Sequence, residues 1–327
     1  MLLDYEKLED FLDKYFGSPH AREARMVGIN RLYDSGYFDI VRFFGEDKIN
    51  PDKVEIHSLP GRYELSDQKI KEFSGKIESQ LRKQGRLYDG PDAMRLKAVN
   101  LTDSPYYISI QACNYGIFAG CCFGLDQPDQ LFDSNGSTLR EYYKQITLST
   151  NLETHPLAMC LGVCGMVVVD KNGDEETNDI QQKRRYLLLV HRSKHLASLE
   201  DTIGVSAAGS VDFTTSCQTL SELSKRSLSQ EIEEELGLAP NEFTVEPLAY
   251  AREIFRGEKP QLFCLIKTPL SVEELTHKLQ NPQQQSEFDS FEFIPMSDDL
   301  IGTLRQMEVN HEVMMNSLLL EEYFTVS

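Results

Sequence analysis

Residues 222–238 read ELSKRSLSQEIEEELGL, and this acidic run decides which fold and which chemistry the sequence predicts. Residues three and four apart share one face of an α-helix, so Glu231, Glu234 and Glu235 are expected to project together as a carboxylate cluster. Two unit charges about 6 Å apart, at an effective dielectric constant of about 20, repel by roughly 3 kcal/mol. A partly buried trio therefore favours a divalent cation, and we predict that these three acids bind Mg²⁺ or Mn²⁺.

The same run carries the signals of a docked helix. At about 100° per residue, Leu228, Ile232 and Leu236 fall on the side next to the acids and give the helix an apolar face. Gly237 is expected to form a left-handed cap at the C-terminus, and Pro240 prevents the helix from continuing. The pattern therefore predicts a helix that packs through its leucines while its acids stay at a cleft.

These residues resemble the signature of the Nudix hydrolases, which reads Gly, five residues, Glu, seven residues, Arg-Glu-apolar-any-Glu-Glu-any-Gly-apolar. The positions that match are Glu222, Glu231, Ile232, Glu234, Glu235, Gly237 and Leu238. Two positions depart, because Ser216 stands in place of the Gly and Gln230 in place of the Arg. With an acidic frequency of about 0.16, the matched acids, Gly and apolar positions arise by chance on the order of 0.002 times in ~300 windows. An ordinary solvated acidic helix is the less favoured interpretation.

The resemblance gives the acids unequal roles. Glu231, Glu234 and Glu235 are expected to be the metal ligands and to act in catalysis. On a continuous helix Glu222 would point nearly opposite to Glu231, so it is expected to belong to the helix entrance as an accessory residue. Gln230 is a second accessory position, because an amide replaces only in part a guanidinium that holds carboxylates through two parallel hydrogen bonds.

A further acid is expected from a loop well after the run, as another ligand or as the general base. Glu287, just before an apolar strand pattern, is the first candidate, and Glu253 and Glu258 are alternatives. A solvated surface acid is the competing interpretation of each.

Other positions are candidates for substrate binding. Arg192 and Arg252 lie at or near strand ends, and the planar fork of arginine matches phosphate oxygens, although surface charge pairing is an equal alternative. Gly209 lies in SAAGSVDF and is expected in a turn, where the resemblance places the backbone close to metal and phosphates. An ordinary turn glycine is the alternative. Tyr106, Tyr107 and Tyr115 are expected either to stack on a base or to fill a core, and a place in the core is the favoured interpretation.

The sequence around the acidic run predicts the fold. Residues 160–170 (CLGVCGMVVVD) and 185–193 (RYLLLVHRS) are apolar, β-branched runs of strand length, which predict a hairpin with a long loop. Later runs predict three more strands, followed by helical character, at residues 243–254, 261–270, 288–296 and 298–324. The fold class is therefore α/β (α+β), a Nudix-type α/β/α sandwich with a mixed sheet.

The length of 327 residues predicts more than one structural unit. Residues 1–85 contain helix-like patterns, YEKLEDFLDKYF and QKIKEFSGKIESQLRKQG, and are predicted to be a helical region of unknown role. Residues 86–155 alternate polar and apolar side chains and are predicted to be a strand-rich segment that accompanies the Nudix domain. A smaller N-terminal α/β domain would thus precede the Nudix hydrolase domain, predicted for residues 156–327.

The composition limits which partners and which kinds of site the sequence predicts. The net charge of −19 and the pI of about 4.8 argue against nucleic acid, since binding its backbone requires a basic surface. No run reaches the ~18 apolar residues of a membrane span, and no signal sequence is recognised, so a cytoplasmic protein without a membrane partner is expected. The seven cysteines form no paired CxxC motifs and indicate neither a disulfide framework nor a zinc site. The oligomeric state is not predicted.

Segments outside the acidic run narrow the resemblance. DGPDAMRL, HPLAMCLGVCGMVVVD, VHRSKHLA and the Gln-Glu-Ile form of the box resemble the UDP-glucose pyrophosphatase subgroup of Nudix hydrolases over residues 86–327. That resemblance implies hydrolysis of a nucleoside diphosphate sugar to a nucleoside monophosphate and a sugar 1-phosphate. Two alternatives stay open: the same chemistry on ADP-ribose, dinucleotides or another nucleoside diphosphate derivative, and a non-catalytic module that binds a nucleotide or a partner.

Overall fold

The computed structural model describes most of the chain after residue 37. The described residues are 38–45, 48–125, 132, 136–146, 152–170, 185–194, 196, 201–253, 256–280, 287–297, 299–307 and 309–326. For residues 38–41, 144–146 and 326 the description covers the backbone alone. In these residues, no helix combines the length and the apolar character needed to cross a membrane.

The larger of two sheets is mixed, and its main strands run in the order β1-β9-β10-β5-β6-β11. β10 is parallel to β5, and the other neighbours in this order are antiparallel. Two short strands branch from the centre, because β7 pairs with β6 and β8 pairs with β5. The bounds are β1 (Phe38–Phe43), β5 (Gly162–Asp170), β6 (Arg185–Arg192), β7 (Ile203–Gly204), β8 (Ala207–Ser210), β9 (Thr244–Glu253), β10 (Lys259–Lys267) and β11 (Phe288–Pro295).

Strand β5 is buried on both faces, which explains its continuous apolar sequence. Its side chains alternate between two cores, as the period of two in a strand requires. Val163, Val167 and Val169 pack in one core, and Cys164 and Met166 pack in the other. The predicted strands at residues 160–170 and 185–193 are thereby confirmed as β5 and β6.

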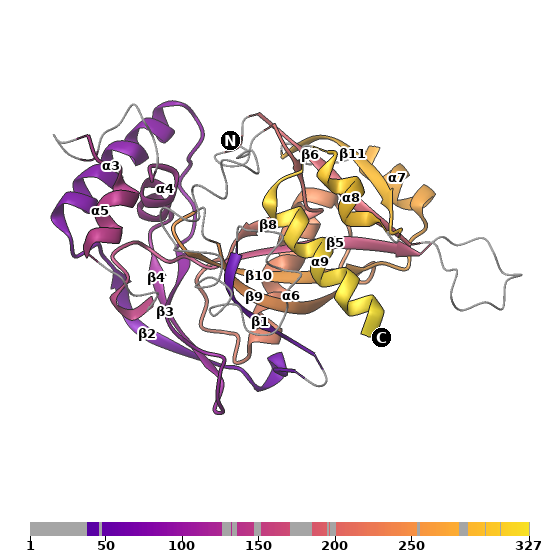
Figure 1. Cartoon of the computed structure of the whole chain (residues 1–327), viewed down its shortest axis with the longest axis horizontal. Helices are drawn as coiled ribbons and strands as arrows, with labels where there is room; N and C mark the ends of the chain where they lie inside the picture. The colour runs from indigo at the N-terminus through magenta and orange to yellow at the C-terminus, as the bar shows by residue number, and fades with distance from the viewer. Residues whose placement is uncertain are drawn as a thin grey trace, which may run out of the picture.

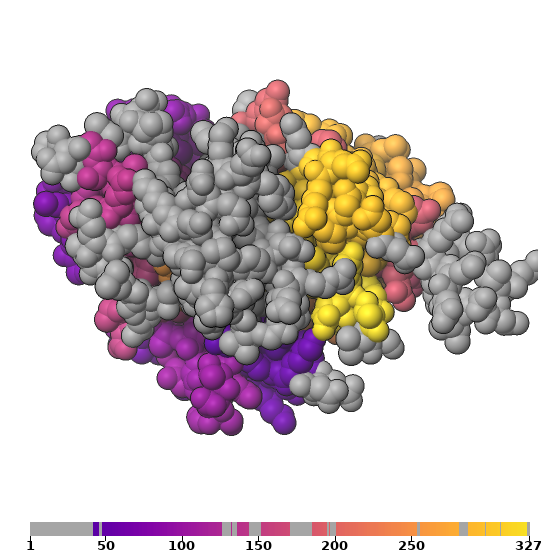
Figure 2. Space-filling model, in the orientation of Figure 1, coloured from indigo at the N-terminus to yellow at the C-terminus, as the bar shows by residue number. Residues whose placement is uncertain are grey.

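Helices cover both faces of this sheet. α6 (Leu220–Glu231) and α7 (Val272–Gln280) contribute to the first core, while α8 (Leu300–Arg305) and α9 (His311–Val326) contribute to the second. Figure 1 shows α9 lying across one face of the sheet with α6 behind the strands, and in Figure 2 the yellow residues of α9 reach the surface. The predicted α/β/α sandwich with a mixed sheet is confirmed.

The sheet forks at its centre, where β5 and β6 separate and β8 pairs with β5. β5 and β6 pair directly only over three residues at one end, Val168 to Asp170 against Arg185 to Leu187. Beyond that point the hydroxyl of Ser206 lies between the strands, where it accepts from the Val167 amide (2.7 Å) and donates to the Leu188 carbonyl (2.6 Å). This hydroxyl satisfies two buried backbone groups that the fork would otherwise leave without partners.

A smaller unit precedes the sandwich, drawn in indigo to magenta in Figure 1. Its sheet has the order β2-β4-β3, with β2 parallel and β3 antiparallel to β4. The bounds of its elements are β2 (Glu55–Tyr63), α3 (Gln68–Lys83), β3 (Ala93–Asn100), β4 (Tyr107–Cys113), α4 (Tyr115–Phe123) and α5 (Leu139–Ile146), with 3₁₀ turns at Pro51–Lys53 and Leu152–Thr154. α3 confirms the helix predicted from QKIKEFSGKIESQLRKQG.

Some sequence expectations for this unit are corrected. Residues 38–63, expected in a helical region, contain strands β1 and β2, and β1 belongs to the larger sheet. Most β2 side chains are exposed, so the sequence carries no apolar alternation that would reveal this strand. The aromatic-rich segment after β4 is helix α4, which begins where the Asn114 side chain accepts from the Gly116 amide (2.7 Å). The helix expected at residues 5–16 lies outside the described residues, and the domain boundaries stay predictions.

Backbone hydrogen bonds join the two units at β3. The Met94 amide donates to the Val211 carbonyl (2.7 Å), and the Leu161 amide donates to the Met94 carbonyl (2.8 Å). The Leu96 amide donates to the Met159 carbonyl (2.9 Å). The segments that lead into β5 and out of β8 are therefore held against the smaller unit.

Leu228 tests the packing of α6 on the sheet, since it is fully buried beside Gly165 of β5. We expect Leu228→Ala to lower the free energy of unfolding by about 2–5 kcal/mol, because a cavity remains in a packed core. Denaturant unfolding of the whole chain measures this change. Lys225→Ala, at an exposed position of the same helix, is the matched control, and equal effects of the two substitutions would contradict this packing.

Candidate active site

The acidic run begins with a reciprocal helix cap. The Glu222 amide donates to the Thr219 hydroxyl (3.3 Å), and the Glu222 carboxylate accepts from the Gln218 amide (2.7 Å). This arrangement is similar to a capping box, except that Glu222 reaches the amide of Gln218, the residue before the N-cap Thr219. Glu222 thus lies at the helix entrance, as its spacing from Glu231 indicated.

The end of the run is not a regular α-helix. After α6 the chain makes a π-helical turn, η5 (Ile232–Leu236), and stops at Gly237, whose φ of 66° is the left-handed cap predicted from the sequence. π-turns inside helices occur frequently at functional sites. Here Glu235 is buried, while Glu233 and Glu234 are exposed.

Glu231 packs against the backbone of β8. A Cβ added at Gly209 would overlap the Glu231 carboxylate, so only glycine allows this contact. Gly209 lies inside β8, paired with Val163 of β5, and not in the turn expected from the sequence. Burial raises the pKa of Glu231 to about 8, and the charges of Glu287, Glu234 and Asp212 add to the shift. This position gives the carboxyl group a strong requirement for a positive partner.

Glu235 is the most buried acid of the run, with 7% of its surface exposed. Burial, followed by the charges of Glu287 and Glu231, raises its pKa well above the usual range, although Arg192 and the backbone of Ala208 oppose the shift. Its Oε1 atom is buried and has no hydrogen-bond partner among the described residues. An orphaned buried carboxylate oxygen is the donor that a hard divalent cation takes.

Glu287 lies close enough to both buried acids to raise their pKa values. It directly precedes β11, and its carbonyl accepts from the Ser193 amide (2.9 Å) at the end of β6. The structure therefore brings Glu287 together with Glu231 and Glu235, and Arg192 also acts on Glu235. The strand pairing of β6 with β11 holds these distant segments side by side.

The two departures from the Nudix signature have definite surroundings. The Gln230 amide donates to Glu234 (3.0 Å), so it still holds one acid of the run. Ser216 lies in the loop before α6, with its hydroxyl 2.9 Å from that of Thr214 and hydrogen-bonded to Arg226. Neither departure removes a buried acid.

A cavity of about 570 Å³ opens beside the acids, which is the size of a small-molecule site. It is bounded by both structural units. The smaller unit and the segment after α3 supply Arg86, Leu87, Tyr88, Gly90, Pro91, Ala93, Tyr115 and Phe118. The larger unit supplies Arg192, Leu196, Ala208, Gly209, Ser210, Asp212, Glu231, Arg256, Lys259, Gln261, Glu287 and Glu312.

Arg252 is not among the residues that line this cavity. It is buried, with its Nε donating to the Glu258 carbonyl (2.7 Å) and its guanidinium 3.6 Å from the Glu258 carboxylate. The substrate-binding interpretation of Arg252 is therefore not supported by its position, nor is the interpretation of Glu258 as the further acid. Both residues belong to a buried ion pair beside the turn between β9 and β10.

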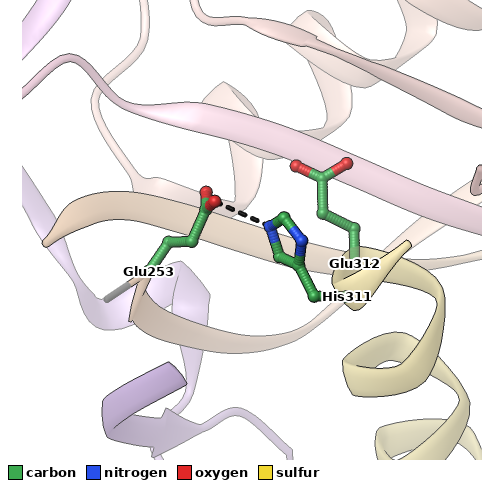
Figure 3. A group of neighbouring side chains, drawn as sticks. All are labelled: Glu253, His311 and Glu312. Atoms are coloured by element: carbon green, nitrogen blue, oxygen red, sulfur yellow. Dashed lines mark hydrogen bonds and ion pairs between the residues drawn. The ribbon is translucent and has the colours of Figure 1, made fainter. Parts of the chain in front are cut away.

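A second acidic group lies at the start of α9. Glu253, His311 and Glu312 are buried, and each offers a ligand atom within 4.8 Å of the others (Figure 3). His311 Nε2 is 2.7 Å from Glu253 Oε1. Among the described residues this group, and not the predicted trio of Glu231, Glu234 and Glu235, meets that distance.

Several cavity residues were not identified from the sequence. Arg256 and Lys259 lie in the stretch FRGEKP, which indicates only a turn, and Arg86 and Asp212 lie in loops without periodicity. Arg86 reaches across to the larger unit, where its Nη2 donates to the Leu196 carbonyl (2.9 Å). Only the tertiary fold brings these residues to one cavity, so no local signal reveals them.

No family model matches the sequence, and no curated protein matches it. Solved structures match about half of the chain. A Nudix hydrolase from M. smegmatis, RenU, has 9% identity over 51% of this chain and 88% of its own, with a TM-score of 0.32. A mutT/nudix family protein from Listeria innocua has 16% identity over 51% of this chain and 98% of its own, with a TM-score of 0.33. The functional assignment therefore rests on the residues of the site.

A third similar structure is Shewanella oneidensis NrtR, with 15% identity over 51% of this chain and 64% of its own, and a TM-score of 0.34. That protein is also known in complex with a 27mer DNA.

The raised pKa of Glu231 predicts how stability depends on pH when divalent cations are absent. A carboxyl group whose folded pKa is raised from 4.5 to about 8 stabilises the fold at low pH and loses that contribution as pH rises toward 8. With a chelator present, we expect the unfolding temperature to fall between about pH 5 and pH 8.5, and to fall further in the wild type than in Glu231→Gln. Glu233→Gln, at an exposed position, is the control, and parallel pH profiles for wild type and Glu231→Gln would contradict the shift.

Proposed function

We propose that this chain is a metal-dependent Nudix hydrolase that cleaves the diphosphate bond of a nucleoside diphosphate sugar. The products are a nucleoside monophosphate and a sugar 1-phosphate, and UDP-glucose is the first substrate by the sequence resemblance. The observation that carries the proposal is the group formed by Glu231, Glu235 and Glu287 at a small-molecule cavity, where burial and then the charge of Glu287 raise the pKa of both Glu231 and Glu235. Such a group is unfavourable unless it serves a cation.

The donor set fits Mg²⁺ or Mn²⁺. Glu231, Glu234 and Glu235 are the proposed ligands, because hard divalent cations prefer carboxylate oxygens and Glu235 Oε1 has no other partner among the described residues. When bound, the ion polarises the phosphoryl oxygens and lowers the pKa of a coordinated water. Gln230 keeps Glu234 in place through its amide.

The chain's own residues account for the remaining steps. Water attacks one phosphorus, the bond from that phosphorus to the bridging oxygen breaks, and the sugar 1-phosphate leaves. Glu287 is the proposed general base that takes the proton of the attacking water, since it faces both buried acids from a separate loop. Arg192 lines the cavity beside them and is proposed to bind a phosphate oxygen through its guanidinium.

The cavity walls suit a nucleotide sugar. Tyr115 and Phe118 from α4 line it together with Arg86 and Tyr88, and Tyr88 is 76% exposed. An exposed aromatic ring at a cavity wall offers a surface on which a base can stack. The two other interpretations use the same residues: hydrolysis of ADP-ribose, a dinucleotide or another nucleoside diphosphate derivative, and nucleotide binding without turnover.

A substrate panel discriminates these interpretations. The purified chain is incubated with Mg²⁺ and, in turn, UDP-sugars, ADP-ribose and dinucleotides, and the released monophosphate is measured. We expect turnover of a UDP-sugar, with Glu235→Gln lowering the rate by about two orders of magnitude or more because a ligand is lost. Glu233→Gln removes the same charge from an exposed position and should retain activity. If none of these compounds is hydrolysed, a non-catalytic nucleotide-binding module is the remaining interpretation.

Gly209 provides an independent test of the geometry. We expect Gly209→Ala to lower the hydrolysis rate by about 100-fold, because its Cβ would displace the Glu231 carboxylate. Gly90→Ala is the matched control, since Gly90 also lines the cavity but a Cβ there meets nothing within 4 Å. Equal rates for the two variants would mean that Glu231 does not act from this position.

A further inference from the structure

The acidic group at the start of α9 holds an arginine in place of a metal ion. Arg256 Nε lies 2.6 Å and 2.7 Å from the two carboxylate oxygens of Glu253, and its Nη2 donates to Glu312 (2.5 Å). A divalent cation between these acids would lie against a guanidinium that already contacts both. The ligand geometry in Figure 3 therefore serves Arg256, and we assign no metal to this group.

The charges of this group are balanced. Burial alone would raise the pKa of Glu253, but Arg256 and His311 outweigh it and hold the pKa below its usual range. Glu312 behaves in the same way, because Arg256 and Lys259 outweigh its burial. Two carboxylates thus face two cations, in contrast to the acids of η5.

Both cations are buried and keep donors that no described residue uses. Arg256 is 8% exposed and Lys259 is 4% exposed, and both line the cavity. Among the described residues, Arg256 Nη1 has no partner, and the Lys259 ammonium makes one hydrogen bond, to Gln261 Oε1 (2.6 Å). A guanidinium fork and an ammonium with unused protons form a site for a phosphate group.

The backbone makes room for this pair. A Cβ added at Gly162, the first residue of β5, would overlap Lys259 Nζ and Gln261 Oε1. The cations also lie apart from Glu231, because Lys259 packs against Gly162 whereas Glu231 packs against Gly209, which pairs with Val163, and successive residues of β5 such as Gly162 and Val163 face opposite sides of the sheet. One cavity therefore contains an acidic end and a separate cationic end.

We propose that Arg256 and Lys259, oriented by Glu253, Glu312 and Gln261, form a phosphate-binding subsite of this cavity. The subsite binds the phosphoryl group of the diphosphate that water does not attack. This proposal rests on the proposed hydrolysis of a diphosphate. Glu253, Glu312 and Gln261 are positioning residues, because they contact the cations and not the ligand. Burial lowers the effective dielectric constant around these cations and so strengthens their attraction for phosphate oxygens.

Inorganic phosphate is the probe that tests the subsite. The chain is titrated with phosphate in a chelator at constant ionic strength, and the dissociation constant is measured by calorimetry. We expect the wild type to bind phosphate without divalent cations and Lys259→Met to bind at least tenfold more weakly. Lys259→Met removes one of the charges that stabilise Glu312 but leaves the hydrogen bonds from Arg256 to both carboxylates in place. Lys267→Met is the control, because Lys267 belongs to the same strand but pairs with Glu246 at the surface.

A second variant keeps the test decisive if Lys259→Met does not fold. Gly162→Ala removes no charge and displaces Lys259, so it should also weaken phosphate binding. Absence of phosphate binding by the wild type, or equal binding by wild type and the folded variants, overturns the subsite. Hydrolysis is measured separately with Mg²⁺ and UDP-glucose. Phosphate binding without turnover contradicts the proposed function alone, whereas turnover with unchanged phosphate binding in the variants contradicts the subsite alone.

Discussion

The contact between the Glu231 carboxylate and the backbone of Gly209 is the constraint on which the site depends. Glu231 ends α6, and Gly209 pairs with Val163 of the central strand β5, so the contact fixes the helix, the branch strand and the sheet relative to one another. A side chain at position 209 would separate them. The same close approach removes water from the carboxylate and raises its pKa to about 8. Docking of the helix and the requirement for a cation therefore have one cause.

The sandwich could be predicted because its central strands and helix are recognisable from short stretches of sequence. The apolar run of β5 and the leucines of α6 need no distant partner to be recognised, and the Gly237 cap follows from adjacent residues. The buried acids of the site were predicted for the same reason, since their spacing along one helix is a local property. Glu287 was identified from its place before an apolar strand, and the pairing of β6 with β11 brings it to the other acids.

What the sequence did not predict depends on tertiary contacts. Arg252 and Arg256 are both arginines next to the same turn, yet one pairs with Glu258 away from the cavity and the other lines it. Their different positions are set by the folded chain and are not indicated by residue spacing. The expected turn at Gly209 is a strand because the fork opened by Ser206 lets β8 pair with β5. The exposed β2 carries too few apolar side chains to show a period.

The two structural units supply different halves of one cavity, and this explains why the fold needs both. The hydrogen bonds of β3 to the segments around β5 and β8, and the reach of Arg86 to Leu196, hold the aromatic wall of α4 against the charged wall of the sandwich. The charged wall is itself divided. Acids of η5 lack a full complement of cations, whereas Glu253 and Glu312 are neutralised by Arg256 and Lys259. A ligand that uses both ends must offer hydrogen-bond acceptors to the remaining donors of Arg256 and Lys259 and share a metal ion with the acids. A diphosphate meets both requirements in one group, because its oxygens can bind the cations and a shared divalent ion together.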